Sequence, residues 1–253
     1  MTGDDHVLAR DLAGQAGRRL LELRAQGGDP DVLRKAGDRL SHEFLTAALA
    51  ALRPGDVVLS EEGADNPARL GARRVWIVDP LDGTREFGEP GRADWAVHVA
   101  LWESDTKDLT AGAVALPAQD TVLSTLEPPP GPPGDGAPAP LRIVVSRSRP
   151  PSFVRDISGL INAELVPLGS AGAKVAAVVC GEVDAYVHGG GFYEWDTAAP
   201  VAVARAAGLH ASRIDGSALA YNQPDLLMPD ILVCRPAIAG VLLQAIREVT
   251  HAP

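Results

Sequence analysis

The chain has 253 residues, a formal net charge of −10 at pH 7, 46% hydrophobic residues and 22% charged residues. These values are ordinary for a folded globular protein, whereas the acidic balance disfavours a nucleic-acid-binding protein, which needs a broad basic surface. No apolar run reaches the roughly 18 residues that a membrane-spanning helix requires, so we expect no membrane association.

The N-terminal residues and the cysteines favour a cytoplasmic location. The chain begins with the acidic and polar MTGDDHVLAR rather than with a basic region before an apolar stretch, so we expect no secretory signal. Cys180 and Cys234 are too few for a disulfide framework, and neither lies at zinc-ligand spacing. Both are flanked by small or β-branched apolar residues, which predicts buried thiols.

Two helices and a sheet are predicted in the first half of the chain. Apolar residues recur at helical spacing over residues 7–23 and again over residues 33–52, where the sequence RPG ends the pattern. Five short, β-rich segments bounded by turns follow without helices between them, which predicts a mostly antiparallel sheet. These segments are residues 57–60, 75–78, 95–102, 111–116 and 121–126.

A segment rich in proline and glycine divides the chain. Residues 128–140, in the run EPPPGPPGDGAPAP, have no helical or strand pattern and predict an exposed loop or linker. We expect an N-terminal α+β domain over residues 1–127 and a C-terminal α/β domain over residues 141–253. A hairpin insertion within one domain is the alternative.

Strands alternate with helices after this segment, which favours an α/β layer. The predicted strands are residues 142–145, 164–167 and 185–187, and the predicted helices are residues 152–161, 171–179 and 197–207. Gly208 follows the last of these helices, at a position where glycine is favoured because it adopts a left-handed conformation.

The segment VWIVDPLDGT, residues 75–84, is the most informative in the chain. A buried strand that ends in Asp79 and Asp82 indicates that both carboxylates are held there for a cation, because unpaired buried charges are very costly. The turn allows these carboxylates and the carbonyl of Leu81 to converge, which suits Mg²⁺. Gly83 leaves a backbone amide for a phosphate oxygen, and Thr84 supplies a hydroxyl that can orient water.

Two other acidic groups stand at the ends of predicted elements. Glu61 and Glu62 follow a strand, and Asp196 precedes the alanine-rich helix, where it would be the N-cap. Three acidic sites of this kind are compatible with a two-metal centre. Taken singly, they have simpler explanations: a turn at Asp79, a solvated charge pair at Glu61 and Glu62, and a helix cap at Asp196.

The combination resembles the inositol monophosphatase-like superfamily of magnesium-dependent, lithium-sensitive phosphatases. That family carries a Glu-Glu pair, then Asp-Pro-[Leu/Ile]-Asp-Gly-Thr after a strand, then Trp-Asp-x-Ala at a helix start. The matching residues here are 61–62, 79–84 and 195–198, and the resemblance spans nearly the whole chain. It implies a layered α-β-α-β-α fold, combining α/β and α+β character, and hydrolysis of a phosphate monoester with two or three Mg²⁺ ions.

The resemblance also implies roles for individual residues. The metal ligands would be Glu61, Asp79, the carbonyl of Leu81, Asp82 and Asp196, with Asp79 bridging two ions. Gly83 and Thr84 would form the phosphate-binding turn, and Asp196 would also face the substrate. Thr84 would help to activate a water that attacks phosphorus in line, without a phosphoenzyme. The implied catalytic residues are Asp38, Glu61, Asp79, Asp82 and Thr84.

Asp38 is the implied partner of that threonine. In the family this partner is an aspartate in a Thr-x-Ala-Asp segment of the second helix. Asp38 occupies that place in the sequence RKAGD, although the usual threonine and alanine are missing. A solvated helix aspartate is the alternative.

Two segments of the C-terminal half are suited to anions. They contain Ser146 and Arg147 at a strand end, and Gly169, Ser170 and Lys174 at a turn that enters a helix. Similar segments occur in the CysQ-type branch of the family, the 3′(2′),5′-bisphosphate nucleotidases, where they would hold the 5′-phosphate and the nucleoside. A surface lysine is the alternative for Lys174.

The loop after residues 184–187 also favours a nucleotide. Inositol phosphatases carry a glutamate for sugar hydroxyls there, whereas this chain has His188 followed by three glycines. We interpret His188 itself as a solvated loop residue, and contact with the substrate is the alternative.

The resemblance therefore implies removal of the 3′-phosphate from 3′-phosphoadenosine 5′-phosphate, with a role in sulfur assimilation. Inositol monophosphatase or fructose-1,6-bisphosphatase activity is the alternative, and a non-catalytic module that binds metal or nucleotide is a more remote one. The expected partner is a small phosphorylated nucleotide rather than a nucleic acid or a membrane. A homodimer is expected because dimers are common in the family.

Overall fold

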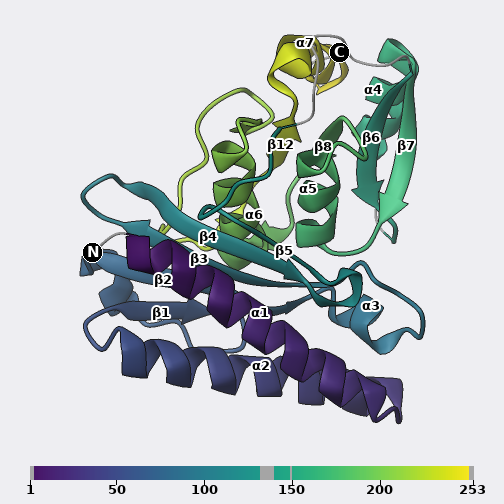
Figure 1. The fold of residues 1–253 in the computed structure, drawn as a ribbon. Coiled ribbons are helices and arrows are strands. Elements are labelled where there is room, and N and C mark those ends of the chain that lie inside the picture. The colour runs from purple at the N-terminus through teal and green to yellow at the C-terminus, as the bar shows by residue number, and fades with distance from the viewer. Residues whose placement is uncertain (1–2, 132–139, 149, 251–253) are drawn as a thin grey trace.

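Helices and sheets alternate in five layers in the computed structural model, which describes residues 3–131, 140–148 and 150–250 (Figure 1). Helices α1 (Gly3–Ala25) and α2 (Pro30–Leu52) cover one face of a first sheet. Helices α5 (Ala171–Val179) and α6 (Glu194–Ala206) lie between that sheet and a second one, whose far face is covered by α4 (Ser152–Ile161) and α7 (Pro236–Thr250). The predicted α-β-α-β-α arrangement is confirmed.

The first sheet contains five strands in the order β1-β2-β3-β4-β5. Strand β1 is parallel to β2 and the other three pairings are antiparallel, so the prediction of a mostly antiparallel sheet is confirmed. The strands are β1 (Val57–Ser60), β2 (Arg74–Asp82), β3 (Ala96–Glu103), β4 (Asp108–Leu116) and β5 (Thr121–Ser124). The sequence did not predict the short helix α3 (Thr84–Gly88) or the 3-10 helices Pro67–Gly71 and Pro117–Gln119.

The second sheet is mixed and has the order β10-β12-β8-β6-β7. Its strands are β6 (Leu141–Ser146), β7 (Ala163–Leu168), β8 (Ala185–His188), β10 (His210–Ser212) and β12 (Ile231–Cys234). Strand β6 runs parallel to β7 and β8, whereas β12 is antiparallel to β8 and β10. Strands β9 (Phe192–Tyr193) and β11 (Leu227–Met228) form a separate pair. No element was predicted after Gly208, so the sequence did not predict β10, β11, β12 or α7.

Strand β2 shows how the layers are held together. Trp76 and Val78 belong to the hydrophobic cluster against α1 and α2, whereas Val75 and Ile77 belong to the cluster against α5 and α6. Both faces of the strand are therefore buried, which explains its continuous apolar run. The second cluster also contains Val144 from the C-terminal half, so the two halves share a core. The division into two domains stays a prediction.

Helix α6 begins earlier than the sequence indicated, which corrects one assignment. Tyr193 is the N-cap, and Asp196 is the third residue of the helix rather than its cap. The Asp196 carboxylate reaches back and accepts a hydrogen bond from the backbone N–H of Tyr193 at 2.6 Å. At the other end, Gly208 has φ +78° and donates to the carbonyl of Arg205, as predicted for a residue after a helix end.

The prediction of two buried thiols is half wrong. Cys234 is buried in β12, but Cys180 is exposed because it ends α5, where the chain turns outward at Gly181. Most of the predicted loop or linker, residues 132–139, lies outside the described residues. Among the described residues, no helix is long and apolar enough to cross a membrane.

Gly112 offers a test of the contact between the first sheet and α6. A Cβ atom at this buried position would lie 2.7 Å from the Cβ of Ala202. We expect Gly112→Ala to lower the free energy of unfolding by about 1–3 kcal/mol through overpacking. Gly240→Ala is the matched control, because Gly240 is exposed in α7 with nothing near its missing Cβ. This control should be stabilising by about 0.5–1 kcal/mol. Denaturant unfolding measures both, and equal effects of the two changes would contradict the close packing.

Candidate metal and phosphate site

Three carboxylates meet between the first sheet and α6. Asp79 and Asp82 lie at the end of β2, and Asp196 lies in the first turn of α6. Each offers an oxygen atom, and these oxygen atoms all lie within 4.8 Å of one another. The side chains of Asp79 and Asp82 are buried, and Asp196 is half-buried. The structure thus brings together three of the residues that the sequence predicted as metal ligands.

A β-bulge explains why Asp79 and Asp82 face the same side. Asp79 is paired with His98 on β3, and Asp82 is paired with Ala96, so three steps on β2 match two steps on β3. In a regular strand, residues three apart point to opposite faces, and the extra residue removes this difference. Asp79 also accepts a hydrogen bond from the backbone N–H of Leu81 at 3.0 Å, which fixes the turn.

Crowding of carboxylates raises their pKa values. Burial, and then the charges of Glu61 and Asp82, hold the pKa of Asp79 well above its usual range. Burial and Asp82 raise the pKa of Asp196 to about 6, and burial and Asp196 raise the pKa of Glu61 to about 7. Glu61 is an exposed residue outside the compact trio, but its carboxyl group interacts with that of Asp79. A divalent cation would offset this repulsion, so the donor set fits a metal ion with oxygen ligands.

Asp82 is the exception, because donors surround it. Its oxygens accept backbone hydrogen bonds from Ala171 at 3.1 Å and from Gly172 at 2.6 Å, and Nε2 of His98 lies 3.2 Å away. Burial alone would raise the pKa of Asp82, but the charge of His98 and these hydrogen bonds outweigh burial and lower it. Burial likewise opposes the charged form of His98, but Asp82 outweighs it and raises the pKa of His98.

Thr84 and Asp38 are in contact. The Thr84 hydroxyl can donate to Oδ1 of Asp38 at 3.2 Å or to the carbonyl oxygen of Leu81 at 3.0 Å. Burial, and then the charge of Glu62, raises the pKa of Asp38 to about 6. Asp38 therefore lies where the resemblance placed it, despite the missing threonine and alanine.

Glycines on either side of this turn allow the close approach of other elements. A Cβ on Gly37 would lie 2.8 Å from Phe87 and 2.9 Å from Leu81, so glycine lets α2 bring Asp38 to the turn. Gly83 has φ +83°, and a Cβ there would lie 2.9 Å from the Cβ of Ser170. Only glycine suits this position, which joins the turn to the start of α5.

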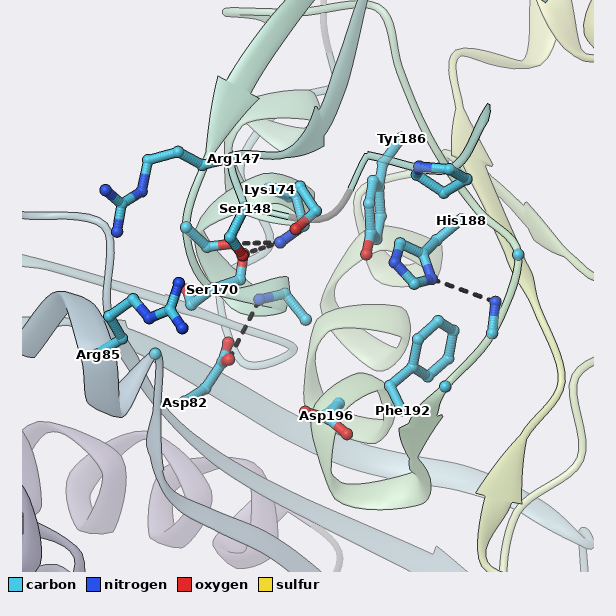
Figure 2. Close-up of a pocket in the computed structure, with 18 of the residues that line it drawn as sticks. Asp82, Arg85, Arg147, Ser148, Ser170, Lys174, Tyr186, His188, Phe192 and Asp196 are labelled. Carbon is cyan, nitrogen blue, oxygen red and sulfur yellow. Dashed lines mark hydrogen bonds between the residues drawn. The ribbon is translucent and has the colours of Figure 1, made fainter. Parts of the chain in front are cut away.

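A cavity of about 710 Å³ opens beside the acidic trio (Figure 2). One side is polar and the other is aromatic. The polar side includes Asp82, Arg85, Ser146, Ser170 and Asp196, and the aromatic side includes Phe153, Tyr186, His188 and Phe192. The His188 ring centroid lies 5.1 Å from that of Phe192 and 6.1 Å from that of Tyr186. His188 thus lines the cavity, in contrast to the interpretation as a solvated loop residue.

The predicted anion-binding residues line this cavity, but protein groups already contact several of them. Nη2 of Arg147 lies 2.7 Å from Oε1 of Glu86 and 3.0 Å from Oε1 of Glu89. Lys174 is buried, and its ammonium group donates to the carbonyl oxygens of Gly169 and Ser170.

The backbone of the same turn is also engaged. The N–H of Gly169 donates to Asp94 at 2.6 Å, and the Ser170 hydroxyl accepts from Ala173 as the N-cap of α5. Ser146 lines the cavity from the end of β6.

Sequence reasoning missed Arg85, Tyr186, Phe192 and His98. Arg85 follows Thr84 directly and points toward the cavity, where it donates no hydrogen bond to the described residues (Figure 2). Its place after the Asp-Gly-Thr turn is the signal that could have identified it. The aromatic residues and His98 lie on strands whose apolar patterns indicate only burial.

Comparisons with known proteins agree with this geometry. The sequence profile of the inositol monophosphatase family matches residues 9–131 and 133–251. The 3′-phosphoadenosine 5′-phosphate phosphatase of Mycobacterium leprae is 52% identical over 261 residues, which cover 97% of this chain and 94% of the relative. The 3′(2′),5′-bisphosphate nucleotidase CysQ of Escherichia coli K12 is 31% identical over 230 residues, covering 83% of this chain and 91% of the relative. The structure of inositol monophosphatase-II from Staphylococcus aureus has a similar fold, with a TM-score of 0.82, 22% identity, and coverage of 96% of this chain and 95% of that one.

The raised carboxyl pKa values predict that the metal-free protein loses stability as the pH rises. The pKa values of Asp38 and Asp196 rise from 3.8 to about 6, and that of Glu61 rises from 4.5 to about 7. Over this interval the folded state binds more protons than the unfolded chain. The contribution of these groups is therefore fully present below roughly pH 4 and is lost as the pH rises through 7. The thermal midpoint of the chelated protein should fall between pH 5 and pH 8.

Asp196→Asn tests the origin of this effect, because it removes one of the repelling charges. We expect a smaller fall in the thermal midpoint over the same interval. The raised pKa of His98 also makes the stability fall as the pH rises. The lowered pKa of Asp82 affects the stability only below the interval from pH 5 to pH 8. A midpoint of the chelated wild-type protein that rises from pH 5 to pH 8 would contradict the assignment.

Proposed function

The chain belongs to the inositol monophosphatase family, and on that premise we propose that it hydrolyses 3′-phosphoadenosine 5′-phosphate to AMP and phosphate. The observation that carries the proposal is the juxtaposition of an acidic metal site with a cavity that is polar on one side and aromatic on the other. A relative of that name, 52% identical over nearly the whole of both chains, supports it. The reaction belongs to the chemistry by which cells assimilate sulfate.

Mg²⁺ is the proposed cofactor, with two or three ions bound. Asp79, Asp82, Asp196, the carbonyl of Leu81 and Glu61 would hold them, because carboxylate and carbonyl oxygens are the ligands that Mg²⁺ prefers. The bound cations would supply Lewis-acid stabilisation of the phosphoryl oxygens and lower the pKa of the nucleophilic water. They would also neutralise the acidic site, which otherwise repels a phosphorylated substrate.

Thr84 and Asp38 provide a route for a proton. Above about pH 6 Asp38 is ionised and can accept the hydrogen of the Thr84 hydroxyl, 3.2 Å away. The threonine oxygen then presents a lone pair to the nucleophilic water and orients it toward phosphorus. The backbone N–H of Gly83 would hold a phosphoryl oxygen. In-line attack by water requires no protein nucleophile.

The aromatic side of the cavity suits the adenine ring. Tyr186, His188 and Phe192 offer flat apolar faces. Gly190 and Gly191 have φ values of +97° and +82°, and a Cβ on Gly190 would lie 2.0 Å from the carbonyl oxygen of Pro229. The glycine run therefore lets the backbone pass close behind this wall without a side chain that would fill the cavity.

The second phosphate would lie on the polar side. Arg85 is available for it because it donates no hydrogen bond to the described residues, and the hydroxyls of Ser146 and Ser170 lie on the same side. Arg147 could contact this phosphate only by giving up contacts with Glu86 and Glu89. Gly169 and Lys174 shape the turn that presents Ser170. The cytoplasm is the proposed location, which the two free thiols support.

Competing substrates test the proposed specificity. We expect kcat/KM with Mg²⁺ to be roughly 100-fold higher or more for 3′-phosphoadenosine 5′-phosphate than for inositol 1-phosphate, because only the nucleotide contacts both sides of the cavity. Phosphate release measures both rates. Fructose 1,6-bisphosphate serves as a control for a second phosphate without a base. A clear preference for inositol 1-phosphate would overturn the choice of substrate.

Asp79→Asn tests the metal mechanism. The change keeps the size of the side chain but removes the charge from the most buried of the three carboxylates. We expect kcat to fall by roughly 100-fold or more, as when a main electrostatic contributor is removed. Asp105→Asn is the control, since Asp105 forms only an exposed ion pair with Arg73, and its rate should match the wild-type rate. Unchanged activity in Asp79→Asn would exclude the mechanism.

A further inference from the structure

His98 is a fully buried histidine that the proposed mechanism does not use. It lies on β3 and is the register partner of Asp79 on β2. Its Nε2 atom lies 3.2 Å from Oδ2 of Asp82, and its Nδ1 atom lies 3.1 Å from the carbonyl oxygen of Trp195. The ring thus touches the end of β2 on one side and the first turn of α6 on the other.

These two contacts connect the two elements that carry the carboxylates of Asp82 and Asp196. Asp82 belongs to β2, and Trp195 directly precedes Asp196 in α6. The ring therefore lies between β2 and the start of α6, the two elements that carry Asp82 and Asp196. A cation shared by both carboxylates needs their oxygens at set positions, and these oxygens lie within 4.8 Å of each other.

The ring has little freedom to move. A Cβ added to Gly172 would lie 2.2 Å from Nε2 of His98 and 3.1 Å from Oδ2 of Asp82. Glycine is therefore required where α5 passes the histidine, and the backbone of α5 holds the ring against Asp82. The backbone N–H groups of Ala171 and Gly172 bind the same carboxylate. Three elements, β2, β3 and α5, thus restrain Asp82, and His98 extends the restraint to α6 through Trp195.

We propose that His98 is a positioning residue that holds the carboxylates of Asp82 and Asp196 at the spacing that a shared cation needs. It acts through the contacts of its two ring nitrogens with oxygens on different elements: Nδ1 with the carbonyl of Trp195 and Nε2 with the carboxylate of Asp82. The inference rests on the proposed metal-dependent function, but it concerns the positions of the carboxylate ligands themselves. Loss of the ring would remove both contacts and leave the start of α6 less restrained relative to β2.

Three substitutions separate the two contacts. The amide of His98→Gln can place an N–H near the position of Nε2 and keep the contact with Asp82. The shorter amide of His98→Asn can place an N–H near the position of Nδ1 and keep the contact with Trp195. His98→Leu fills the space but removes both nitrogen contacts. His210→Gln is the matched control, because His210 lies on β10 and bonds to Ser212.

The measurement is Mn²⁺ binding by titration calorimetry without substrate, together with thermal unfolding of the chelated proteins. We expect His98→Leu to weaken Mn²⁺ binding by roughly 10- to 100-fold, the effect found when a partner of a metal ligand is lost. His98→Gln and His98→Asn should each recover part of the affinity, and His210→Gln should bind as wild type. In activity assays the Mg²⁺ concentration for half-maximal rate should rise, while saturating Mg²⁺ should recover most of kcat.

Wild-type Mn²⁺ affinity in folded His98→Leu would overturn the proposal, even if its thermal midpoint fell, since a purely structural role predicts that result. If His98→Leu does not fold, the two amide variants decide: wild-type affinity in both would overturn the proposal, and weakened affinity in both supports it. The proposed function fails separately, if the wild-type protein binds Mn²⁺ but does not hydrolyse 3′-phosphoadenosine 5′-phosphate.

Discussion

Mutual repulsion of carboxylates is the constraint on which the site depends. The oxygens of Asp79, Asp82 and Asp196 lie within 4.8 Å of one another, and the carboxyl group of Glu61 interacts with Asp79. Two unit charges at this distance repel by about 3 kcal/mol at an effective dielectric constant of about 20. The surrounding fold must supply this energy when no cation is bound. The deep layers of the core, which bury β2 on both faces, hold the strand end in place against the repulsion.

The molecule limits this cost in two ways. Asp82 is stabilised as an anion by His98 and by the amides at the start of α5, whereas the other carboxyl groups tend to keep their protons until a metal replaces them. In the proposed function, this fixed negative charge would attract a cation, and metal binding would release protons from the other carboxyl groups. This division of roles follows from position: Asp82 accepts hydrogen bonds from the amides at the start of α5, and Asp79 faces other carboxylates.

The sequence predicted the parts of the site that are local in the chain. Asp79, Asp82, Gly83 and Thr84 lie in one turn, so their spacing alone indicates their convergence, and the β-bulge completes it. The resemblance to the family extended this to Asp196 and Asp38, which contacts Thr84 as expected. Asp196 was misplaced by three helix positions, because an aspartate that caps from the third position has the same sequence signature as an N-cap.

Contacts between distant segments could not be predicted in this way. The pairing of Arg147 with Glu86 and Glu89 depends on α3, a helix of five residues that has no periodic pattern. His98 has the same apolar neighbours as any core residue of a strand, and only the packing of β3 against α5 and α6 reveals its two acceptors.

The cavity shows how chemistry and substrate selection are divided between the two halves of the chain. The turn after β2 supplies the acidic ligands and Thr84, and the second sheet supplies the aromatic wall through β8 and the loop that follows it. Arg85 is an exception, since it comes from the first half but faces the second phosphate in the proposed complex. Because it follows Thr84 directly, any movement of the phosphate-binding turn also moves this cation. In the proposed complex, substrate charge and catalytic geometry would therefore be coupled through one short segment, residues 82–86, and a substrate without the second phosphate would lose the contact with Arg85.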